Sequence, residues 1–69
     1  MSQKLKPNEL LSFMTKHQLS EGELALTLGV TREAVRHWLA GRRDISHSTS
    51  KMVKVLDQYP QLIPYVRSL

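Results

Sequence analysis

Residues 20–41 read SEGELALTLGVTREAVRHWLAG, and this stretch decides the fold of the 69-residue chain. Ser20, followed three residues later by Glu23, forms a capping-box pattern and predicts that a helix begins here. The apolar stripe of this helix consists of Leu24, Ala25 and Leu28. Gly29 is expected to end it, because glycine adopts the left-handed backbone conformation without a steric penalty. The pattern predicts a short helix that ends in a tight turn.

A second short helix is expected directly after this turn. Thr31 is its predicted N-cap, and Glu33 stands in the first turn, where the helix dipole favours a negative charge. At about 100° per residue, one side of the helix is apolar and holds Val35, Trp38 and Leu39. The opposite side holds Glu33, Arg36, His37 and Ala40, and Arg32 can reach it from the N-terminal end. Gly41 closes the helix.

Further helical segments flank this pair. One is expected from Pro7 to about His17, because proline lacks an N–H and suits the first helical position. Its inward residues are Leu10, Phe13 and Met14. Another is expected from a Ser46 cap to about Tyr59, after a charged connector. Its apolar positions are Thr49, Met52, Val53, Leu56 and Tyr59. Pro60 stops it, and residues 61–69 are predicted to form a short final helix or turn.

The predicted fold class is all-α, a compact bundle of four to five short helices in a single domain over residues 1–69. Within it, residues 20–41 are the helix-turn-helix unit and residues 60–69 are a C-terminal segment. The sequence lacks the alternating apolar–polar pattern and the turn dipeptides that indicate β-hairpins. A chain of this size buries only about 60% of its surface on folding, so its stability is marginal and dimerisation would help.

Positive charge gathers in one segment of the chain. Residues 32–54 contain six basic and two acidic side chains, which accounts for the whole formal net charge of +4. The basic residues are Arg32, Arg36, Arg42, Arg43, Lys51 and Lys54. A basic patch of this kind is typical of a protein that binds a polyanion. A solvated basic face without any ligand would have the same composition, and charge alone does not separate the two interpretations.

The helix pair resembles the Cro- and lambda-repressor-like, or Xre-type, helix-turn-helix family of DNA-binding proteins. The family pattern is matched without insertion by Glu21, Ala25, Gly29, Val35 and Trp38. Ala25 is the small residue needed where the two helices touch, and Gly29 is the glycine needed in the turn. The resemblance covers roughly residues 7–59. It implies a lambda-repressor-like fold, in which the second helix of the pair enters the major groove of DNA.

This resemblance also implies which side chains meet the DNA. The expected base contacts are Thr31, Arg32, Glu33, Arg36 and His37. The expected phosphate contacts are Ser20, Arg42, Arg43, Ser46 and Lys51. Glu33 has a second interpretation, since it can instead pair with Arg36 or His37 along the helix. Glu21 departs from the family, in which glutamine is common at this position, because an ionised carboxylate repels phosphate. We therefore leave Glu21 out of the expected contacts.

The function implied is that of a transcriptional regulator, a dimeric repressor or autorepressor that reads an inverted-repeat operator in double-stranded DNA. A homodimer places two recognition helices about 34 Å apart, which matches half-sites one turn apart. The candidate dimer residues are Tyr59, Leu62, Ile63, Tyr65 and Val66. By analogy with the family, a minimal phage or mobile-element regulator fits the short chain. An antitoxin-type module that binds a toxin or other protein partner is the alternative, and RNA remains a possible ligand.

Other classes of protein are not supported by the sequence. It contains no cysteine and no His/Asp/Glu spacing typical of a zinc site, so we expect no metal. Nucleophile-elbow, zinc-protease and phosphate-loop motifs are absent, so we expect neither an enzyme nor a cofactor. Apolar runs are short and Met1-Ser2-Gln3-Lys4 leads into no signal-peptide core. A soluble, cytoplasmic protein without a membrane partner is therefore expected.

Overall fold

A computed structural model of the protein describes residues 4–69, and every element of regular structure in this range is helical. Residues 1–3, on which part of the signal-peptide argument rests, lie outside the described residues. In chain order the elements are α1 (Pro7–Lys16), α2 (Glu21–Leu28), α3 (Arg32–Leu39), α4 (His47–Gln58), the 3-10 turn η1 (Pro60–Leu62) and α5 (Ile63–Ser68). The predicted all-α bundle of short helices is confirmed.

The ends of α2 form as predicted. The Ser20 hydroxyl accepts a hydrogen bond from the Glu23 backbone N–H at 3.1 Å, and the Glu23 carboxylate accepts one from the Ser20 N–H at 2.9 Å. At the other end Gly29 has φ of 70°, in the left-handed region. The chain turns there, and the Val30 N–H donates to the Ala25 carbonyl at 3.0 Å. These local contacts explain why α2 starts and stops where it does.

The ends of α3 follow the same logic. The Thr31 hydroxyl accepts from the Ala34 N–H at 3.0 Å and caps the helix, as expected. Ala40 is the C-cap, and Gly41 follows with φ of 74°. Two residues with positive φ, Gly29 and Gly41, therefore bracket α3 and limit it to eight residues.

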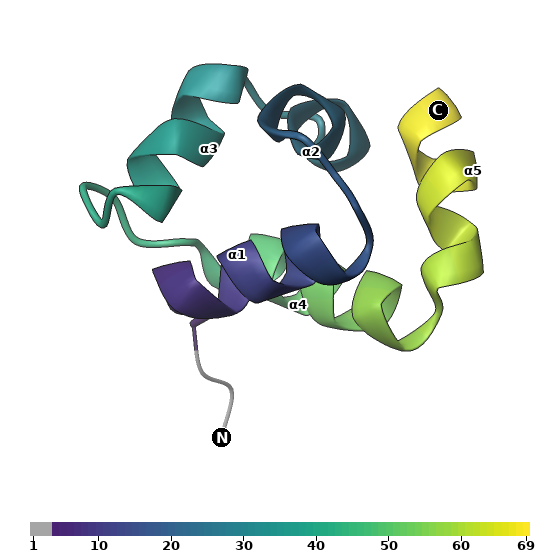
Figure 1. The fold of residues 1–69 in the computed structure, drawn as a ribbon, viewed down its shortest axis with the longest axis horizontal. Helices are drawn as coiled ribbons and strands as arrows, with labels where there is room; N and C mark the ends of the chain where they lie inside the picture. The colour runs from purple at the N-terminus through teal and green to yellow at the C-terminus, as the bar shows by residue number, and fades with distance from the viewer. Residues whose placement is uncertain (1–3) are drawn as a thin grey trace.

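The helices enclose one core, with α2 between α3 and α5 (Figure 1). Helix α1 packs against both α3 and α4, so it joins the two ends of the bundle. The buried apolar side chains are Leu10, Phe13, Met14, Leu24, Ala25, Val35, Trp38, Ile45, Val53, Leu56 and Ile63. The predicted inward residues of α1 are all among them, whereas Leu28 and Leu39 are only partly buried.

Helix α4 differs from the sequence prediction in which residues it buries. Met52 and Tyr59 were expected to face inward, but their exposed fractions are 41% and 53%. The core takes a narrow stripe through Val53 and Leu56 instead, and at about 100° per residue Met52 and Tyr59 fall together on its flank. Ser50 is buried on the same stripe, and its hydroxyl accepts from the Leu5 N–H at 2.9 Å. This bond fixes the N-terminal segment to α4.

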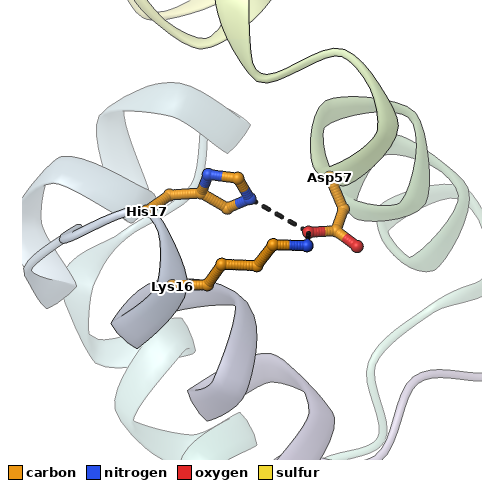
Figure 2. Close-up of polar contacts among 3 residues, drawn as sticks. All are labelled: Lys16, His17 and Asp57. Carbon is orange, nitrogen blue, oxygen red and sulfur yellow. Dashed lines mark hydrogen bonds and ion pairs between the residues drawn. The ribbon is translucent and has the colours of Figure 1, made fainter.

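A polar contact joins the end of α1 to α4 (Figure 2). The Asp57 Oδ1 atom accepts from the Lys16 ammonium at 3.1 Å and lies 2.9 Å from His17 Nε2. An ionised carboxylate only accepts, so Nε2–H is the donor in the second contact. The His17 ring lies against Phe13, with 4.9 Å between ring centroids. The hydrogen bonds from His17 and Lys16 hold the pKa of Asp57 below its ordinary value of 3.8.

Trp38 packs α3 against the core, and the exposed fraction of its side chain is only 6%. Replacement by alanine should lower the free energy of unfolding by about 3–5 kcal/mol, a large part of the stability of so small a domain. Urea denaturation followed by circular dichroism measures this loss. The control is Leu26→Ala on α2, because this side chain is 67% exposed and lies outside the predicted dimer residues, so its removal should change the unfolding midpoint little. Wild-type stability in Trp38→Ala would contradict a core role for the indole.

The Asp57 contact makes a pH-dependent contribution to stability. A carboxylate whose pKa is lower in the folded state stabilises the fold above its unfolded pKa, and this contribution disappears as pH falls through the folded pKa. Asp57→Asn should therefore lower the free energy of unfolding at neutral pH by no more than about 1 kcal/mol, since the contact is largely exposed to solvent.

The same denaturation experiment at low pH tests the sign. When the pH lies below both the folded-state and the unfolded-state pKa of Asp57, this side chain is neutral in both states. Wild type and Asp57→Asn should then have equal stability. Asp44→Asn is the control, because its 3.8 Å contact with Lys4 is more exposed and should contribute less. An Asp57→Asn difference that persists unchanged in acid would show that the side chain acts through packing rather than through its charge.

Candidate nucleic-acid interface

The outer side of α3 is the candidate site. Val35 and Trp38 are buried, while Arg32, Glu33 and Arg36 are exposed and His37 is partly buried. Thr31, at the start of the helix, is also exposed, and its hydroxyl is used as the N-cap acceptor but retains a proton to donate. The structure therefore brings the five expected base-contact residues together on one short helix.

Arg36 is held by the neighbouring helix. Its Nε–H donates to the Glu21 carboxylate at 3.1 Å, and the exposed fractions of the two side chains are 61% and 39%. One of the two interpretations of Glu33 from the sequence was an ion pair with Arg36 or His37 along α3. Among residues 4–69, Glu33 forms no ion pair. The partner of Arg36 stands fifteen residues earlier in the chain, where spacing along one helix gives no signal.

Arg32 also lies against the first turn of α2. A β-carbon placed on Gly22 would be 2.6 Å from Arg32 Nη2, so the guanidinium occupies space that glycine leaves open. Sequence reasoning did not single out Gly22. A glycine inside the first turn of a helix was the available signal, because it costs helix stability and needs a reason. Glu21 and Gly22 thus place both arginines of α3.

The N-terminus of α2 is acidic, and it does not suit the phosphate contact expected at Ser20. The Ser20 N–H is already bonded to Glu23, and chiefly for this reason the pKa of Glu23 lies below its ordinary value. Glu21 adds a second carboxylate in the same turn. A phosphate at this point would meet two carboxylates, each paired with an arginine, and a backbone donor that is already used. Ser20 was expected to contact a phosphate, but its N–H and hydroxyl are both bonded to Glu23, and it is not a suitable phosphate contact.

The N-terminus of α4 has the opposite character. Its first turn contains no acidic residue, and the Ser46 hydroxyl caps it by accepting from the Thr49 N–H at 3.2 Å. Arg42, Arg43 and Lys51 are exposed and form no ion pair within residues 4–69. The positive charges of Arg42, Arg43 and Lys51 are therefore available to an anion.

The predicted dimer residues divide into two groups. Tyr59, Leu62 and Tyr65 are exposed, with exposed fractions of 53%, 38% and 62%. Ile63 was wrongly expected to be at a dimer surface: it is 6% exposed, because α5 turns it into the core of its own chain, and Val66 also packs against that core. Sequence reasoning missed Met52 and Val55, two further exposed apolar residues on α4.

Comparison with protein-family models and with curated proteins finds no match for this chain. In the part of the chain that the structure describes, no group of three His, Cys, Asp or Glu side chains is arranged to hold a metal ion. None of the described helices combines the length and apolarity required to cross a bilayer. The interpretation of the site therefore rests on the arrangement of α2, α3 and the basic segment.

Proposed function

We propose that this protein is a sequence-specific DNA-binding transcriptional regulator of the Xre-type helix-turn-helix class. In this proposal α3 enters the major groove, α2 supports it, and the loop and helix that follow α3 contact the phosphate backbone. The observation that carries it is the exposed polar side of α3, which α2 supports through the short turn at Gly29. Arg42, Arg43 and Lys51, which follow α3 and form no ion pair among residues 4–69, supply the attraction to a polyanion.

Base reading would fall to the exposed side of α3. Arg32 or Arg36 can donate two hydrogen bonds to guanine O6 and N7, and Glu33 can accept one from cytosine N4. The absence of a described ion-pair partner for Glu33 supports this role, since its carboxylate is not already used. Thr31 can meet a phosphate or a thymine methyl group, and His37 adds a contact at the edge of the site.

Phosphate binding would fall to the loop after α3 and to the start of α4. Arg42, Arg43 and Lys51 provide charge, and the capped N-terminus at Ser46 provides backbone dipoles that favour an anion. These contacts position α3 without reading sequence. They also make the affinity for any DNA fall as salt rises.

A homodimer that represses transcription by occupying an inverted repeat completes the proposal. One eight-residue helix reads few base pairs, whereas a twofold dimer doubles the site. Tyr59, Leu62 and Tyr65 supply exposed apolar surface for such a contact, and Met52 and Val55 are further exposed apolar residues on α4. The same surface would serve the second candidate, an antitoxin-type module whose partner is another protein.

In vitro selection from randomised duplexes, followed by fluorescence anisotropy over a salt series, tests the proposed function. We expect an inverted-repeat consensus and tight binding to it in the presence of excess scrambled duplex. A transcript of the selected sequence should compete poorly. Equal affinity for selected and scrambled duplexes at every salt concentration would contradict sequence-specific regulation.

Replacing Arg36 and replacing Arg43 by alanine should change DNA binding in different ways. Arg36→Ala should cost about 1–3 kcal/mol on the selected duplex and relax the preference at one base pair. Arg43→Ala should weaken binding to all duplexes alike and reduce the salt slope by about one. Anisotropy titrations on the selected and scrambled duplexes distinguish them. A uniform loss in Arg36→Ala would make it a phosphate contact, and an unchanged slope in Arg43→Ala would exclude contact there.

The dimer surface is tested by replacing both Tyr59 and Leu62 with serine. The double variant should weaken dimerisation by about tenfold or more, because apolar side chains at an interface carry most of its free energy. Sedimentation equilibrium measures the dissociation constant. Leu11→Ser is the matched control, since this leucine is 54% exposed on α1, away from the predicted segment. A wild-type protein that stays monomeric with and without its selected duplex would favour the protein-partner alternative.

A further inference from the structure

We infer that Glu21 is a positioning residue for DNA reading, whose carboxylate orients the Arg36 guanidinium toward a base. The inference rests on the proposed function. It concerns a residue that sequence comparison with the helix-turn-helix pattern excludes from DNA contact, because a carboxylate repels phosphate. In the structure the same carboxylate is instead bound to the arginine that faces outward from α3.

The geometry of the pair leaves the reading end of Arg36 available. Glu21 accepts from Nε–H at 3.1 Å, which uses one of the five N–H donors of the guanidinium. The two terminal Nη groups are the ones that fork onto guanine O6 and N7. A bond at Nε therefore restrains the long side chain without competing for the atoms that would read the base. This restraint lowers the conformational entropy lost on binding.

The surroundings of Glu21 support a positioning role. Glu21 is the first residue of α2, and the next residue, Gly22, leaves the space in which the Arg32 guanidinium lies. Two arginines of α3 are thus set by one turn of α2. With a 39% exposed side chain, the Glu21 carboxylate also repels nearby DNA phosphates. Its two effects are opposite: it lowers affinity for all DNA and raises discrimination at one base pair.

Two substitutions separate these effects. Glu21→Gln removes the charge but keeps an oxygen that can accept the Nε–H, whereas Glu21→Ala removes both. Anisotropy is measured on three duplexes: the selected duplex, the same duplex changed at the base pair that Arg36→Ala relaxes, and a scrambled one. Both variants should bind the scrambled duplex more tightly than wild type. Glu21→Gln should keep the preference for the selected base pair, and Glu21→Ala should lose it by about twofold or more.

Asp44→Ala is the matched control, because it removes an exposed carboxylate beside the basic loop without contacting Arg36. It should raise affinity for all three duplexes and leave their ratios unchanged. The double variant Glu21→Ala/Arg36→Ala should discriminate no worse than Arg36→Ala alone, since the two residues act through one contact. Thermal denaturation of each variant checks that the fold is retained.

The outcomes distinguish this inference from the proposed function. If wild type does not prefer its selected duplex, the proposed function fails. If wild type and Glu21→Ala show the same preference while Arg36→Ala loses it, DNA reading stands and the positioning role is overturned. Equal tightening of all duplexes by Glu21→Ala would likewise reduce Glu21 to a repulsive charge.

Discussion

The left-handed turn at Gly29 is the constraint on which the rest of the structure depends. With φ of 70°, this residue ends α2 and allows α3 to start at Arg32 after only Val30 and the cap residue Thr31. A residue with a β-carbon would be strained there. The turn places Val35 and Trp38 in the core, with Ala34 and Leu39 packed against it, so the opposite side of α3, with Arg32, Glu33 and Arg36, faces outward. The polar side chains of α3 are available for the candidate site because only one side of this helix packs on the core.

The helix ends then divide the surface by charge. The carboxylates of Glu21 and Glu23, in the first turn of α2, compensate the positive end of its helix dipole. The start of α4 has a neutral cap and follows two unpaired arginines, Arg42 and Arg43. Because helix dipoles and side-chain charges act over the same short range, an anion is repelled from one end and attracted to the other. This asymmetry would orient a polyanion relative to α3.

The elements that sequence reasoning predicted correctly are those set by local contacts. The capping box at Ser20 and Glu23, the Thr31 cap and the turn at Gly29 each involve residues a few positions apart. A short stretch of sequence is enough to predict these contacts, because both partners of each contact belong to the same turn. The boundaries of α2 and α3, and the list of side chains that face outward from α3, were therefore accessible before any coordinates.

The contacts that were missed join residues far apart in the chain. Leu5 donates to Ser50 over 45 positions, His17 contacts Asp57 over 40, and Arg36 reaches Glu21 over 15. Periodicity shows which side of a helix is apolar, but not which helix packs on it, so Ile63 was predicted to contact another chain. The same limit applies to Glu21, whose charge looks unfavourable until its partner on α3 is known.

The small core has a consequence for how such a domain could be regulated. Tyr59, Tyr65 and Met52 stay exposed because the buried stripe of α4 is narrow and α5 contributes mainly Ile63. Exposed apolar surface costs free energy in water, and covering it in a dimer recovers part of that cost at a rate of about 25 cal/mol for each Å². A marginally stable monomer gains more from such a contact than a large domain does. If the dimer forms, folding, dimerisation and DNA occupancy are linked through protein concentration, and salt further lowers DNA occupancy.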